Sequence, residues 1–140
     1  MDSRRLARIA AMSLYYEREI KDSADEYSTT LVDFEDVLER AKLDDANLQY
    51  IDDALTSLEA HREDMDQLIS ANLKDWTIER ISKVDLSILR LAVAEMLYME
   101  DIPVSVSVNE AVEISKLYSD REAYKFINGI LRNISRTLEK

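Results

Sequence analysis

The segment Lys125-Phe-Ile-Asn-Gly-Ile-Leu131 holds the only glycine of the chain, Gly129, inside a run whose apolar spacing is that of a helix interior. The apolar residues recur three or four positions apart, at Phe126, Ile130, Ile134 and Leu138. An Asn-Gly pair is also a hairpin signal, but the flanking residues do not alternate as strands do. Glycine inside a helix costs about 1 kcal/mol relative to alanine. Either a neighbouring backbone packs against Gly129 or a ligand needs the room.

Composition extends the helical prediction to the whole chain. The 140 residues include one Gly and one Pro, too few for the tight turns of a sheet protein, and 46% of them are apolar, enough for a folded core. The chain lacks cysteine, so disulfides and thiolate metal sites are excluded. We therefore expect one compact all-α domain over residues 1–140.

Apolar periodicity and capping pairs divide the chain into about six or seven helices. Capping pairs precede several of them: Thr30 with Asp33, Ser82 with Asp85, Ser107 with Glu110, and Ser119 with Glu122. Val104, Val106 and Val108 alternate with serines as in a strand, but the helical period that follows outweighs this signal. The expected helices cover residues 3–21, 30–41, 44–73 (one helix, perhaps kinked, or two in line), 83–97, 107–118 and 119–138. We also expect a short helix or turn at 76–82 and a loop at 22–29.

Most catalytic classes find no support in the sequence. One glycine cannot build a phosphate-binding loop, and the single histidine, His61, lacks the Glu-x-x-His spacing of a di-metal bundle. We expect His61 on a helix surface, and we expect no catalytic residue, metal or cofactor. The chain contains no run of 18 apolar residues and its start is unlike a secretory signal, so we expect a cytoplasmic protein without a membrane span.

Charge is unevenly distributed along the chain. Its net charge is −11, yet residues 1–21 carry five cationic side chains against three carboxylates. Such a terminus is often just a solvated helix face. Aromatic residues occur near cations, however, and this mixture is typical of surfaces that stack bases and neutralise phosphates, although aromatics at helical spacing are more often core. These aromatic residues are Tyr15, Tyr16 and Tyr27 near the N-terminus, and Phe126 beside Lys125.

Several stretches resemble the NusB family of bacterial transcription antitermination factors. The opening Arg4-Arg-Leu-Ala-Arg8 with Tyr16 is similar to the family's start. The central helix of the family resembles Trp76-Thr-Ile-Glu-Arg80 followed by Val84-Asp-Leu-Ser-Ile-Leu-Arg-Leu-Ala92 and Glu95. Its most characteristic signature is matched by Asp101-Ile-Pro-Val104, Val108-Asn-Glu-Ala-Val-Glu113 and Lys125–Leu131. The stretches follow in the family's order, whereas residues 22–70 carry little of the signature.

The resemblance implies a fold, partners and a set of contacts. The implied fold has two packed helical halves, without enzyme activity. The implied partners are the small-subunit ribosomal protein NusE, with which the family binds the single-stranded boxA element of nascent ribosomal RNA, and RNA polymerase, which then reads through termination signals. The resemblance assigns phosphate contacts to Arg4, Arg5 and Arg8, base or sugar contacts to Tyr16 and Phe126, polar contacts to Lys125 and Asn128, and places near the RNA surface to Asp85 and Glu122.

The chain departs from the family pattern at three positions. Ile9 and Arg132 stand where the family usually has acidic residues, and Ser119 replaces a common glycine. Two alternatives remain open: a helical protein-interaction module without RNA binding, and a homodimer that buries the RNA surface. Because Lys125 and Gly129 share a stripe beside that of Phe126 and Ile130, we expect close helix packing behind Gly129 and RNA contacts from the residues before it.

Overall fold

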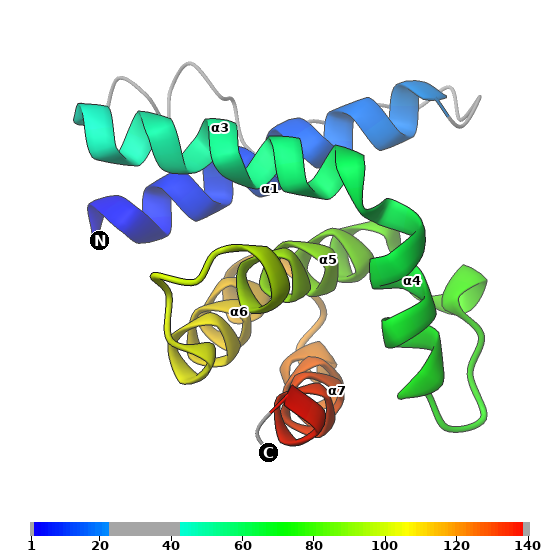
Figure 1. Ribbon diagram of the computed structural model, residues 1–140. Helices are drawn as coiled ribbons and strands as arrows, with labels where there is room; N and C mark the ends of the chain where they lie inside the picture. Colours follow the sequence, from blue (N-terminus) through cyan, green and yellow to red (C-terminus); the bar gives the residue numbers. More distant parts are fainter. Residues whose placement is uncertain (1, 23–42, 139–140) are drawn as a thin grey trace. The chain divides into compact units, whose positions relative to one another are not determined.

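The computed structural model describes residues 2–22 and 43–138, which form α-helices and one short 3-10 helix without a strand (Figure 1). This confirms the all-α prediction. The elements are α1 (Ser3–Asp22), α3 (Asp45–Ala60), α4 (Arg62–Ala71), the 3-10 helix η1 (Ile78–Arg80), α5 (Lys83–Tyr98), α6 (Val104–Tyr118) and α7 (Ala123–Leu138). The helix expected at residues 30–41 and nearly all of the loop at 22–29 lie outside the described residues; Asp22 belongs to α1.

The chain divides into two compact units, Met1–Thr56 and Ser57–Lys140. Two units agree with the two helical halves that the resemblance implies, and their union into one domain stays a prediction. In the N-terminal unit, the buried side of α1 combines small residues, Ala7, Ala10 and Ala11, with larger ones such as Ile9 and Met12. The helix expected over 44–73 is two helices, because His61 between them leaves helical geometry at φ −123° and ψ 22°.

Helix α5 is the centre of the C-terminal unit. Residues 87–95 are buried without interruption, as the nearly continuous apolar run predicts. The helix begins where expected, since the Ser82 hydroxyl accepts a hydrogen bond from the Asp85 amide at 3.1 Å. Helix α6 packs against α5 and α7, and α5 also contacts α4 and α7. A bidentate ion pair joins α5 to α4, in which buried Arg90 donates twice to Asp66 at 2.8 Å.

Two of the expected capping pairs are wrong, because their serines have tertiary partners. Helix α6 begins at Val104 directly after Pro103, so Ser107 is its fourth residue and not its N-cap, and its hydroxyl donates to the buried Glu95 carboxylate at 2.9 Å. Ser119 ends α6, and its hydroxyl donates to Asp85 at the start of α5. Helix α7 therefore starts later than expected, at Ala123.

The packing expected behind Gly129 is also wrong. Gly129 is exposed on α7, and a Cβ at this position would meet no atom of the C-terminal unit within 4 Å. Its φ is not positive, so its backbone is one that alanine also adopts. The buried face of α7 consists instead of Ile127, Ile130, Leu131 and Ile134. Nothing in the fold of this unit explains why position 129 is glycine.

Candidate nucleic-acid interface

The first turns of α1 hold the three arginines expected to contact phosphates, and α3 positions two of them. Arg4 Nε donates to Asn47 Oδ1 at 2.7 Å, and its guanidinium carbon lies 4.8 Å from the centroid of the Tyr50 ring. The guanidinium of Arg8 lies over the same ring at 5.6 Å. Such cation–π contacts help to fix the position of an arginine side chain. Asn47 and Tyr50 thus belong to the site, and only their helical spacing on the buried side of α3 could have indicated them.

Exposure separates these N-terminal residues. Arg4 and Arg5 are half-buried, whereas Arg8 is 4% exposed. Tyr16 is 9% exposed and Tyr15 is 2% exposed, so little of either ring is available for stacking. The predicted roles of Arg8 and Tyr16 stay predictions, and the core interpretation holds for Tyr15. Tyr27 lies outside the described residues.

The C-terminal unit contributes an aromatic cluster on its surface. The rings of Trp76 and Phe126 have centroids 6.2 Å apart and are tilted by 54°. Arg80 lies over the Trp76 ring at 5.4 Å. Trp76 is 51% exposed and Phe126 half-buried, so the cluster offers a ring face beside a cation, which suits a stacked base. The sequence indicated Phe126 for this role. Trp76 and Arg80 were missed, and an exposed tryptophan in a short polar connection was the available signal.

The acidic residues expected near the RNA surface are both engaged within the unit. Asp85 is half-buried and accepts the hydrogen bond from Ser119, so it joins the start of α5 to the end of α6. Glu122 pairs with Lys125 at 2.8 Å, with both side chains exposed. Lys125 also lies 5.9 Å from the Tyr124 ring. Lys125 therefore meets a phosphate only in competition with Glu122.

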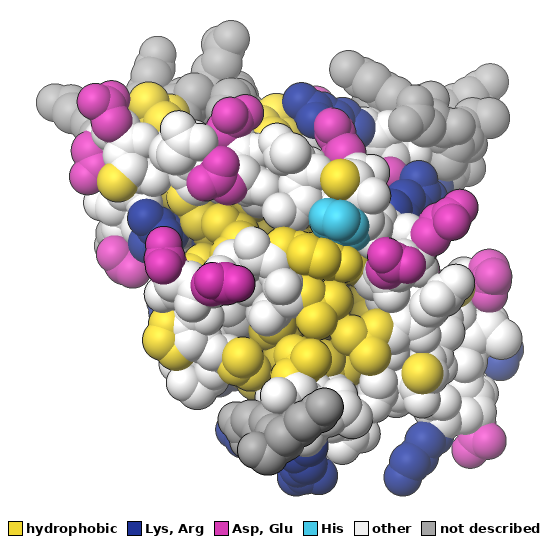
Figure 2. Space-filling view, viewed as in Figure 1, with side chains coloured by type: hydrophobic (Ala, Val, Ile, Leu, Met, Phe, Trp, Pro, Cys, Tyr) yellow, Lys and Arg dark blue, Asp and Glu magenta, His cyan; other side chains and the backbone are white. Residues whose placement is uncertain are grey.

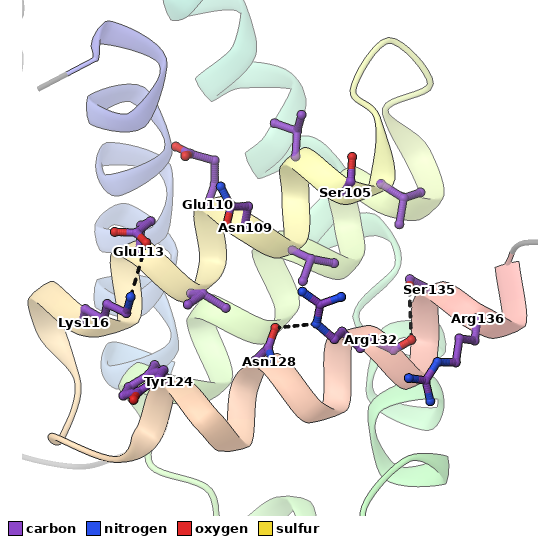
Figure 3. A pocket seen from close by; sticks show the side chains of 14 residues that line it. Ser105, Asn109, Glu110, Glu113, Lys116, Tyr124, Asn128, Arg132, Ser135 and Arg136 are labelled. Atoms are coloured by element: carbon purple, nitrogen blue, oxygen red, sulfur yellow. Dashed lines mark hydrogen bonds and ion pairs between the residues drawn. The ribbon is translucent and has the colours of Figure 1, made fainter.

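Asn128 lies in a groove of about 920 Å³ between α6 and α7. In Figure 3, Asn128 and Arg132 project from α7 toward α6, and Arg132 Nε donates to Asn128 Oδ1 at 3.0 Å. Lys116 on α6 lies over the Tyr124 ring at 5.2 Å and pairs with Glu113 at 3.4 Å. Arg132 and Lys116 thus bring donor groups to the groove from both helices.

Apolar side chains gather on another face of the C-terminal unit, next to the histidine (Figure 2). His61 is half-exposed between α3 and α4, in keeping with the expected surface position, and its ring stacks on Tyr98 with centroids 3.9 Å apart. Desolvation, with the nearby Asp64 carboxylate, raises the pKa of the Tyr98 phenol above 10.0. Half-exposed apolar residues continue from this tyrosine through Met99 and Ile102 to the start of α6. This face suits contact with another protein.

Residues 2–22 and 43–138 contain no group of three or more His, Asp or Glu side chains placed to hold a metal ion. Among the same residues, no helix is both long and apolar enough to cross a bilayer.

These features define an all-helical protein with clustered arginines on its first helix and an exposed aromatic cluster beside a cationic last helix. The sequence model of the NusB family matches residues 5–136, and the chain belongs to this family. A relative from Natranaerobius thermophilus, described as transcription antitermination protein NusB, is 43% identical over 141 residues, which cover 99% of this chain and 98% of the relative.

Solved structures agree with this assignment. T. maritima NusB has a TM-score of 0.77 and 31% identity, over 97% of this chain and 92% of that one. A crystal structure of antitermination factors NusB and NusE in complex with dsRNA contains a chain with a TM-score of 0.77 and 25% identity, over 98% of both chains.

Proposed function

We propose that this protein is a transcription antitermination factor. It pairs with the small-subunit ribosomal protein NusE and binds the boxA element of nascent ribosomal RNA in the cytoplasm, so that RNA polymerase reads through termination signals. The observation that carries the proposal is the structural similarity, over nearly the full length, to a chain in a crystal structure of NusB and NusE in complex with dsRNA. The role is one of binding, and the proposal includes no catalytic step.

The contacts divide between the two units. Arg4 and Arg5 neutralise phosphates, and Asn47 and Tyr50 hold Arg4 in place for this task. In the C-terminal unit, Phe126 with its neighbour Trp76 stacks a base or sugar. Lys125 and Asn128 donate hydrogen bonds to the RNA strand next to this stacked base or sugar. Asp85 and Glu122 lie near the RNA surface. Arg8 and Tyr16 support these contacts from their buried positions.

Charge explains why the protein needs a partner to bind RNA. A net charge of −11 repels RNA at long range, so the N-terminal arginines hold a phosphate chain only weakly by themselves. A basic ribosomal protein relieves this repulsion, and the apolar face beside His61 gives it a surface to contact. With roughly three to five phosphates contacted, the slope of log K against log salt is about −2 to −3.5.

The direct test is transcription in a bacterial extract depleted of its own NusB-family protein. The template carries boxA upstream of a terminator. Added protein should raise read-through on this template and leave a template with scrambled boxA unchanged. Read-through that does not rise, or rises equally on both templates, contradicts the proposal.

Two double variants test whether read-through depends on the N-terminal arginines. Arg4→Gln with Arg5→Gln should lower read-through, whereas Arg62→Gln with Lys74→Gln removes the same charge from exposed positions on α4 and after it and should not. Equal loss in both pairs would make net charge, and not the N-terminal arginines, the cause. A protein that binds NusE but gives no read-through would be an interaction module, and a homodimer would show as concentration-dependent sedimentation.

A further inference from the structure

Helix α7 has the largest net positive charge of the helices among the described residues. It carries Lys125, Arg132 and Arg136 and no carboxylate, in a chain of net charge −11. Neither arginine has a carboxylate partner among the described residues, since Arg132 donates to Asn128 and Arg136 to Asn133 at 3.5 Å. The helix dipole favours a cation in the last turn, which accounts for Arg136 but not for Arg132 in the middle of the helix. The charges of Arg132 and Arg136 are therefore available to an external anion.

Gly129 lies on the same exposed face. Lys125, Gly129, Arg132 and Arg136 follow at spacings of four, three and four residues, which places them on one side of the helix. The glycine costs about 1 kcal/mol in helix propensity, and no atom of the C-terminal unit requires it. A glycine on an exposed helix lets another molecule approach the backbone closely.

The groove beside this face supplies further polar groups. Its lining includes Asn109, Lys116 and Tyr124 in addition to Asn128 and Arg132 (Figure 3). Two carboxylates also line it, but Glu113 pairs with Lys116 and Glu110 is 9% exposed. Amide and guanidinium donors beside an aromatic ring match a single strand of RNA, whose phosphates accept and whose bases stack. From Lys125 to Arg136 the face is roughly 16 Å long at a rise of 1.5 Å per residue, so it can follow several phosphates.

We propose that the outer face of α7 and the α6–α7 groove form a second RNA track. The track carries single-stranded RNA that flanks boxA past Gly129 to Arg132 and Arg136. The inference rests on the proposed function, because it extends that RNA surface along α7.

The test compares RNAs of two lengths on the complex of this protein with NusE. One is boxA alone, and the others add a single-stranded extension of about ten nucleotides at the 5′ or the 3′ end. For the wild type, one extension should tighten binding. Arg132→Gln with Arg136→Gln should remove this gain and lower the magnitude of the salt slope by about 1.4 on the extended RNA, with binding of boxA alone unchanged. The control pair Arg62→Gln with Lys74→Gln should keep the gain.

A larger side chain at position 129 tests whether RNA approaches the backbone of α7 closely. Gly129→Gln should weaken binding of the extended RNA while the helical circular-dichroism signal stays at the wild-type value. An extension that adds no affinity overturns the track, as does an equal loss on both RNAs, which would assign the arginines to boxA itself. Binding of a polyglutamate peptide that Arg132→Gln abolishes, without any gain from extended RNA, would make the groove a site for acidic peptides. Wild-type protein that fails to bind boxA contradicts the proposed function instead.

Discussion

Replacing Gly129 by alanine should stabilise the protein. An added Cβ meets no atom of the C-terminal unit within 4 Å, and the glycine backbone has no positive φ, so alanine enters without strain. The gain is then the propensity difference between alanine and glycine inside an exposed helix, about 1 kcal/mol in the free energy of unfolding. For a chain of this size, that corresponds to an increase of about 3 °C in Tm.

Thermal and urea unfolding followed by circular dichroism measure this change. A substitution series provides the control, because alanine, leucine and valine at position 129 should rank in this order of stability, all above glycine, if propensity alone acts. Steric packing would instead rank stability by size, with glycine the most stable and leucine, the largest side chain, the least stable. An alanine variant less stable than the wild type would refute the argument that this face of α7 is open.

Three further predictions concern the C-terminal unit. Asp66→Asn should lower the free energy of unfolding by roughly 3 kcal/mol, since buried Arg90 loses its carboxylate; urea unfolding measures it, and a loss below 1 kcal/mol would contradict it. Ser82→Ala should cost about 1 kcal/mol by removing the cap of α5, whereas Ser82→Asp should retain most of the stability. Tyr98 has a pKa raised above 10.0 by burial and by Asp64, so its contribution to the free energy of unfolding is complete below pH 10 and is lost as pH rises through the folded-state pKa. Tyr98→Phe should therefore flatten the decline in the free energy of unfolding above pH 10.

Much of the fold could be predicted from sequence because apolar periodicity is a local property. It identified α1 and the buried α5, and it outweighed the alternating valines at the start of α6. The capping pairs at Ser107 and Ser119 failed because a serine hydroxyl bonds equally well to a distant carboxylate. No local pattern distinguishes these two uses.

The candidate site was harder to predict for the same reason. The arginines at the start of α1 were indicated by composition, but their positioning by Asn47 and Tyr50 depends on contacts across 42 or more residues of chain. Periodicity did place Gly129 on the stripe of Lys125, away from the buried isoleucines of α7. That stripe faces outward, and the packing expected there assumed a neighbour that the C-terminal unit does not provide.

Equilibrium titration of labelled boxA RNA tests the central claim most directly. The protein is added with and without NusE at one fixed salt concentration, and a scrambled RNA of the same length and composition is titrated in parallel. We expect the protein and NusE together to bind boxA more tightly than either alone and more tightly than the scrambled RNA. Equal affinity for both RNAs, or affinity that does not change when NusE is present, would contradict the account.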